Sequence, residues 1–343
     1  MTVLDSKYFW LRRMNVKNKI SRVSFALEQI IRILSMQFAL APAAYAVPRK
    51  WALSIANILS LLLVILPNPG FITYLRIRSA FGKSRLSSLY LTWDCLARIF
   101  RDFVILKRII YKRENPLNWR IVEKNVDGIN SLRKTSEPYI IATGQFAKRL
   151  SLSVFSPEVT DGHLVVVGNA PVERIRCLYD LRLRIQYGNL VKATYSCWGR
   201  DLEGVFVGNN LSTGRILNRR LHERGNIVCI AVDAPWRETL TGSYNRPFAG
   251  WRSRWFSTGA AQLARLAQCP IISCVPMEES DGTIVLEWGV PIRINGSEAN
   301  NDVNLMNKLL DSVEVAIGER PMQYIIDIGG ERRWNSKSKR WED

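Results

Sequence analysis

The stretch PYIIATGQFAKRL, residues 138–150, places a short apolar run directly before a polar turn. The run YIIATG has the length and the β-branched content of a buried strand, and a glycine ends it. Gln145 follows at the point where the strand stops. Because functional side chains in parallel α/β sheets gather at the carboxyl ends of the strands, this stretch predicts a site at Gln145.

From about residue 120 the chain alternates short apolar runs with helical patterns. Further strands are predicted for HLVVVG at 163–168, LVKATY at 190–195, NIVCIAVD at 226–233 and PIISCVP at 270–276. Helices are predicted for residues 173–186, 214–225 and 253–268. This alternation predicts an α/β layer with a largely parallel sheet.

The positive charge of the chain is concentrated in its first half. The formal net charge is +18, from 48 basic and 30 acidic side chains. Residues 1–150 hold 25 basic and 8 acidic side chains, a net charge of +17, whereas residues 151–343 hold 23 and 22, a net charge of +1. The basic residues flank apolar helical runs, which favours membrane lipids as the partner and argues against nucleic acid.

The N-terminal segment contains two apolar helical patterns. Residues 1–35 predict an amphipathic helix along a membrane surface, with apolar residues at spacings of three and four: Ile20, Val23, Leu27, Ile31 and Leu34. Residues 51–75 are 25 residues without a charge, which is long enough to cross a bilayer. The internal PNPG at 67–70 should end that helix. A span and a re-entrant or interfacial helix pair both stay open, with a buried core helix as the third alternative.

A third helix is predicted for residues 84–113, and its far end is strongly basic, in the sequence KRIIYKRENP at 107–116. The pattern changes close to residue 115. We therefore expect two parts, a basic apolar helical membrane-associated segment at 1–115 and an α/β domain at 116–343.

Five blocks of the α/β half follow one another in a characteristic order. They are VDGINSLRKTSEPYIIATG at 126–144, NAPVERIRCLYDLRLR at 169–184, LHERGNIVCIAVDAP at 221–235, RPFAGWRSRWFSTGAAQLARLAQCPIISCV at 246–275 and RPMQYIIDIGGERRW at 320–334. Together they resemble the late acyltransferases of lipid A biosynthesis, the bacterial lauroyl and myristoyl transferases.

This resemblance implies a fold, a reaction and a location. The fold would be a glycerolipid acyltransferase-like mixed sheet flanked by helices, with an N-terminal helical membrane-associated segment. The reaction would move an acyl chain from acyl carrier protein, the co-substrate, to a hydroxyl of a glycolipid acceptor, either lipid A or the lipid anchor of a surface polysaccharide. It implies no bound cofactor, and it places the protein on the cytoplasmic face of the bacterial inner membrane. No metal site is expected, because the chain has only two histidines and no cluster of Cys or His near either.

The family carries a His-x4-Asp/Glu motif at the end of the first strand of this region. Its histidine removes the proton of the acceptor hydroxyl, and its carboxylate orients the imidazole. In this chain the resemblance assigns Gln145 to the histidine position and Leu150 to the carboxylate position. Glutamine cannot act as a base near neutral pH, and the loss of general-base catalysis typically costs about 10² to 10⁴ in rate.

Other positions keep the chemistry that the resemblance implies. Arg182 and Arg184 match the family's Arg-x-Arg, which would stabilise an oxyanion or hold an anionic head group, with a solvated helix face as the alternative. Asp233 matches a strand-end aspartate, with a turn or cap before Pro235 as the alternative. Lys148 would attract an anionic substrate.

The two histidines are expected to be structural. His163 opens a predicted strand, at the end away from a site, and His222 lies near the end of a predicted helix. Two functions therefore stay open. The chain is either an acyltransferase with an altered mechanism or a catalytically inactive relative that binds glycolipid or acts as a scaffold.

Overall fold

The computed structural model describes residues 19–154, 156, 159–160, 163–169, 175, 177–198, 202–207, 212–223, 226–234, 238, 242–293, 299–324 and 328–343. Its centre is a seven-stranded sheet with the strand order β1-β9-β8-β2-β5-β3-β4. The strands are β1 (Ile121–Lys124), β2 (Tyr139–Thr143), β3 (Leu164–Asn169), β4 (Leu202–Val207), β5 (Ile227–Ala231), β8 (Ile271–Glu278) and β9 (Ile284–Trp288).

The sheet is mixed but mostly parallel. Every neighbouring pair runs parallel except β8 and β9, which are antiparallel. Strand β2 lies between β8 and β5, and all five of its residues are buried. A strand covered on both faces needs a continuous apolar sequence, which explains the run YIIAT. The prediction of a helix-flanked mixed sheet is confirmed.

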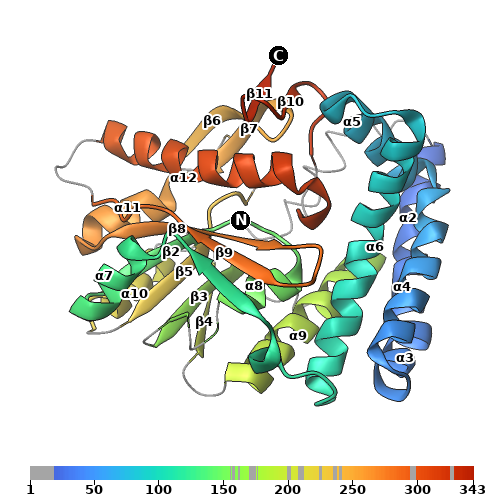
Figure 1. Cartoon of the computed structure of the whole chain (residues 1–343), viewed down its shortest axis with the longest axis horizontal. Coiled ribbons are helices and arrows are strands. Elements are labelled where there is room, and N and C mark those ends of the chain that lie inside the picture. The colour runs from blue at the N-terminus through green and yellow to red at the C-terminus, as the bar shows by residue number, and fades with distance from the viewer. Residues whose placement is uncertain are drawn as a thin grey trace.

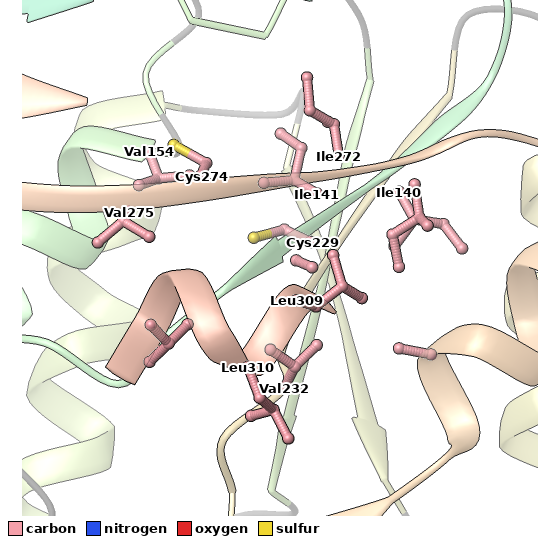
Figure 2. Close-up of a cluster of buried hydrophobic side chains, with 14 of the residues drawn as sticks. Ile140, Ile141, Val154, Cys229, Val232, Ile272, Cys274, Val275, Leu309 and Leu310 are labelled. Carbon is pink, nitrogen blue, oxygen red and sulfur yellow. The ribbon is translucent and has the colours of Figure 1, made fainter. Parts of the chain in front are cut away.

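Helices cover the sheet on both faces and at one end (Figure 1). They are α7 (Asp127–Thr135), α8 (Lys148–Val154), α9 (Leu178–Trp198), α10 (Ser212–Leu221), α11 (Gly259–Ala267) and α12 (Ala299–Glu319), with short turns η3 (Pro116–Asn118) and η5 (Pro321–Gln323). Figure 2 shows the core, in which Ile141 of β2 and Cys229 of β5 gather with Leu309 and Leu310 of α12. This core holds the central strands in place and with them the loops at their carboxyl ends.

Two sequence predictions of local structure are wrong. Residues 190–195, predicted as a strand, belong to helix α9, where Ala193 lies in one buried cluster with Ile105 and Ile109 of α6. Packing along a neighbouring helix has overridden a short β-like pattern. Residues 253–268, predicted as one helix, begin in strand β7 (Trp251–Ser257), which forms a hairpin with β6 (Ser243–Phe248). The turn residues Ala249 and Gly250 both have positive φ, which suits a tight hairpin connection.

A layer of helices precedes the sheet. Its elements are α2 (Lys19–Leu34), η1 (Ser35–Leu40), α3 (Ala41–Ala46), α4 (Arg49–Val64), η2 (Pro67–Phe71), α5 (Ile72–Phe81) and α6 (Arg85–Ile110). Within the described ranges, the stretch Val23–Ala46 has the length and composition of a membrane-crossing helix. The stretches Arg49–Val64 and Pro69–Phe81 meet at 91°. The prediction that PNPG ends the second apolar helix is confirmed.

The helical layer and the sheet share one interface. The last helix of the layer ends at Ile110, and the first strand begins at Ile121, so the expected division near residue 115 falls between them. Figure 1 shows α6 between the sheet and the outer helices α2 and α4. The C-terminal hairpin of β10 (Arg333–Asn335) and β11 (Arg340–Glu342) lies near α5.

Candidate functional site

The loop after β2 is held against the end of β5. The backbone N–H of Gln145 donates a hydrogen bond to Oδ2 of Asp233, at 2.9 Å. The N–H of Ala147 donates to the carbonyl oxygen of Gln323, at 2.8 Å. Gln145 and Asp233, chosen from the sequence as strand-end residues, are therefore direct neighbours at the carboxyl edge of the sheet.

Asp233 is fully buried, and its charge is balanced by groups from other elements. Burial raises the pKa of the Asp233 carboxyl, while the Gln145 N–H, the charge of Arg254 and the hydroxyl of Tyr324 act in the opposite direction. Arg254 Nη2 also donates to the main-chain oxygen of Asp233, at 3.3 Å. The carboxylate therefore positions the loop rather than facing solvent.

Several polar atoms gather around this carboxylate without ideal hydrogen-bond geometry, although the side chains of Asp233, Tyr324 and Arg254 interact with one another. They are Thr143 Oγ1, Asp233 Oδ1, Arg254 Nη1 and Tyr324 Oη. Because Asp233, Tyr324 and Arg254 interact with one another, the group is a buried polar network at the carboxyl edge of the sheet. The residue analysis did not select Arg254 or Tyr324. A signal existed for Tyr324, because it lies in the RPMQY block that carries the family resemblance.

The two positions assigned to the acid–base motif have different environments. Gln145 is half-buried in the loop, whereas Leu150 is fully buried in α8 and belongs to the core of the sheet. A carboxylate at position 150 would lie among apolar side chains, where its ionised form is costly. Leucine at this position is therefore part of the packing.

Helix α8 begins with two basic residues, Lys148 and Arg149. Arg149 is buried, forms an ion pair with Glu278 and lies over the Trp119 ring at 5.2 Å. Its charge is therefore neutralised within the protein. The side chain of Lys148, expected to attract substrate, lies outside the described residues.

Arg182 and Arg184 point into different surroundings. Arg184 is exposed, as the solvated-face alternative predicts, but Arg182 is buried with only 9% of its surface exposed. Its guanidinium lies over the Tyr179 ring at 4.9 Å. Burial, followed by the nearby charge of Arg32, lowers the pKa of Arg182 to about 10.

The surroundings of Arg182 come from the N-terminal helix α2. Arg32 of α2 forms an ion pair with Glu28 at 2.7 Å, so these two charges neutralise each other. Within the described part of the chain, Arg182 forms no ion pair with a carboxylate and its Nε has no acceptor, while the nearby charge of Glu28 raises its pKa in part. No hydrogen bond or ion pair among these residues joins Arg182 to Gln145 or Asp233, so the two predicted groups form separate sites.

Both histidines lie at the opposite edge of the sheet from Gln145. The carbonyl oxygen of His163 accepts a hydrogen bond from Ile227 N–H at the start of β5, at 2.9 Å. His222 follows α10 and is exposed, with Nδ1 2.7 Å from the carbonyl oxygen of Asn218. The positions expected for both residues are confirmed. No group of three or more metal-ligating side chains occurs in the described ranges.

Neither a scan against protein-family models nor a search of curated proteins finds a match to this chain. The resemblance to lipid A acyltransferases therefore rests on the ordered sequence blocks. The geometry adds two independent features, a buried polar cluster around Asp233 and a buried arginine at the interface between α9 and α2.

Proposed function

We propose that this chain is a membrane-associated, acyltransferase-like protein of glycolipid biosynthesis that binds an anionic glycolipid head group at Arg182. The observation that carries the proposal is a buried guanidinium that forms no ion pair among the described residues. An unpaired buried charge is strongly unfavourable, so an external anion is the group that would stabilise it.

The chemistry of Arg182 suits a phosphate or carboxylate group. A planar guanidinium donates two parallel N–H bonds to such anions. The Tyr179 ring, 4.9 Å from the guanidinium carbon, fixes the plane of the fork. Glu28 forms its ion pair with Arg32 and acts on Arg182 only as a nearby charge, which leaves the N–H donors of Arg182 without a paired carboxylate among the described residues.

For the reaction, the resemblance supports transfer of an acyl chain from acyl carrier protein to a glycolipid hydroxyl by an altered mechanism. Such a mechanism needs a group that accepts the hydroxyl proton. Gln145 has no titratable nitrogen, and the carboxylate of Asp233 is fully buried and already accepts the Gln145 N–H.

These features favour the second candidate, a catalytically inactive relative that binds glycolipid or acts as a scaffold. Leu150 supports it as well, because the position of the family's carboxylate is filled by a core side chain. We therefore expect head-group binding to be retained and general-base catalysis at position 145 to be absent.

The test compares Arg182→Ala with Arg184→Ala in the full-length chain in lipid nanodiscs, with lipid A as the ligand. Loss of a buried charged contact should weaken binding at least about tenfold in Arg182→Ala. Arg184→Ala, two residues along the same helix, should bind within about twofold of wild type because Arg184 is exposed. Equal affinities of wild type and Arg182→Ala, with unchanged near-ultraviolet circular dichroism, would contradict head-group binding at Arg182.

The two candidate functions are separated in the same nanodiscs with a labelled acyl carrier protein thioester. Binding without transfer of label to the glycolipid supports the inactive relative. Transfer of label that Arg182→Ala abolishes, at substrate concentrations that saturate both proteins, supports the acyltransferase with an altered mechanism.

A further inference from the structure

The distribution of side chains on α4 is the reverse of that in a water-soluble helix. Its buried residues are mostly small: Ala52, Ala56, Ser60 and Leu63. Large apolar side chains lie on the exposed side, and they are Trp51, Ile58, Leu61 and Leu62, followed by Ile65 just beyond the helix. At about 100° per residue these exposed residues share one face, opposite the small buried ones.

In helix α2, as in α4, the apolar side is exposed, and here the buried side carries polar and charged residues. Its exposed apolar residues are Val23, Leu27, Ile30 and Leu34, which recur at spacings of three and four and therefore form one face. Its buried polar residues are Ser24, Glu28, Gln29 and Arg32. A helix that buries its polar side and exposes its apolar side is suited to an apolar solvent.

The exposed apolar surface continues onto the next elements of the layer. Phe71 and Leu75 extend it at the bend between α4 and α5, and Leu86, Leu89 and Tyr90 extend it at the start of α6. At this start of α6, Ser88 and Thr92 are the buried residues. The exposed side chains named on α2, α4, α5 and α6 are called the apolar face below.

We propose that the apolar face docks into one leaflet of an anionic phospholipid bilayer, with the axes of α2 and α4 parallel to the membrane plane. The occupant is lipid acyl chains, because large apolar side chains exposed on one face of each outer helix mark an interaction site, and exposed basic residues beside them suit anionic head groups. The proposal rests on the membrane association in the proposed function and is independent of glycolipid binding and acyl transfer.

The attachment of the layer to the sheet determines the orientation. Along α6, Cys95 contacts the carbonyl oxygen of Pro321, Arg98 pairs with Glu278 at 2.9 Å, and Ile109 packs in one cluster with Leu152. These contacts extend over about 21 Å of helix. At the other end of the layer, Ser79 Oγ donates to the carbonyl oxygen of Gly330 at 2.6 Å.

This side-by-side arrangement is incompatible with helices that cross the bilayer. The apolar core of a membrane is about 30 Å thick, so a crossing bundle would carry the adjoining edge of the polar α/β domain into hydrocarbon. With the helix axes in the membrane plane, the outer helices α2 and α4 contact lipid while the sheet stays in water on the far side of α6 (Figure 1). The long apolar helices are therefore assigned to the surface of one leaflet.

Charge supports a bilayer over a second copy of the chain. Exposed basic residues border the apolar face at the start of α4 and around α5, and they are Lys50, Arg78, Lys83 and Arg85. Two copies docked face to face would bring these like charges together, whereas anionic head groups neutralise them.

The orientation is tested by measuring label depth along α4 in vesicles of phosphatidylglycerol and phosphatidylethanolamine. Nitroxide labels are placed in the full-length chain by Trp51→Cys, Ile58→Cys and Ile65→Cys, each in a background without the three thiols that are not buried, Cys95, Cys177 and Cys197. In-plane docking predicts the same depth at all three positions. A crossing helix predicts that positions 51 and 65 differ in depth by about 21 Å.

Vesicle binding provides the second readout. The double variant Ile58→Asp with Leu62→Asp should bind at least about tenfold more weakly, because charged residues are strongly disfavoured in hydrocarbon. The control is Val290→Asp, which changes an 80% exposed apolar residue of the α/β domain and should leave binding unchanged.

Graded depths along α4 would overturn the in-plane arrangement and leave the proposed function intact. Lipid would be overturned as the occupant if the wild-type chain did not bind vesicles but formed a dimer, and if the double variant Ile58→Asp with Leu62→Asp were monomeric. Loss of lipid A binding in Arg182→Ala with equal label depths would support both proposals separately.

Discussion

At the scale of single residues, Asp233 shows how a buried carboxylate can be structural and still lie at a site. It ends the central part of the sheet and holds the neighbouring loop through the N–H of Gln145. Burial disfavours its charged form, and Arg254 and Tyr324 compensate in part. The residue therefore links the stability of this loop to its own protonation.

The variant Asp233→Asn tests this link through pH. Because the pKa of Asp233 is raised above its usual 3.8, its contribution to stability is present in full below that pH and is lost as the pH rises through the folded-state pKa. Asparagine can still accept the Gln145 N–H and does not titrate. The free energy of unfolding of the variant, relative to wild type, should therefore rise from about pH 4 towards pH 7 in denaturant titrations.

Asp281→Asn is the matched control for this experiment. Hydrogen bonds from Thr283 lower the pKa of Asp281, so its effect on stability changes only below pH 3.8. Its difference from wild type should stay constant above pH 4. A constant difference for Asp233→Asn as well would refute the linkage.

At the scale of secondary structure, the bend between α4 and α5 depends on one close backbone approach. A Cβ atom at Gly70 would lie 2.0 Å from the carbonyl oxygen of Val64, the last residue of α4. PNPG therefore does more than end a helix. It lets the chain fold back against the helix it has just left.

Gly70→Ala and Gly188→Ala should change stability in opposite directions. The first forces a clash with backbone that cannot move aside, which typically costs about 1–3 kcal/mol. The second lies within helix α9 with open space around it, so it should stabilise the protein by about 0.5–1 kcal/mol. Thermal unfolding in one detergent measures both, and a stable Gly70→Ala protein would show that the bend does not need glycine.

At the scale of the whole molecule, the helical layer is tied to the sheet by a shared carboxylate. Glu278 at the end of β8 accepts hydrogen bonds from Arg98 of α6 and from Arg149 of α8. All three side chains are largely buried. The ion pair therefore connects the layer that we assign to the membrane with the edge of the sheet that holds the candidate site.

Removing this carboxylate should destabilise the interface. Glu278→Gln removes the ion-pair partner of buried Arg149 and one of the carboxylates near Arg98, for which about 3 kcal/mol is expected. The adjacent change Glu279→Gln removes a half-exposed pair with Arg320 and should cost less than about 1 kcal/mol. Denaturant unfolding gives both values, and equal effects of the two substitutions would mean that the buried network does not hold the layers together.

The sequence alone was sufficient to predict the α/β class, the strands β2, β3, β5 and β8, and the end of the second apolar helix at PNPG. It also predicted that Gln145 and Asp233 lie at the carboxyl ends of strands. All of these depend on local periodicity, on glycine and proline, and on the direction shared by parallel strands. The sequence was wrong at 190–195, where contacts with α6 outweighed the local pattern, and at 253–257, which belong to strand β7.

Only the tertiary structure brought Arg254 and Tyr324 to Asp233, and only it separated buried Arg182 from exposed Arg184. It also decided that α2 and α4 turn their large apolar side chains outward. An apolar periodicity gives a helix two faces, but which face is buried depends on the element that packs against it. That choice is made by contacts between residues far apart in the chain.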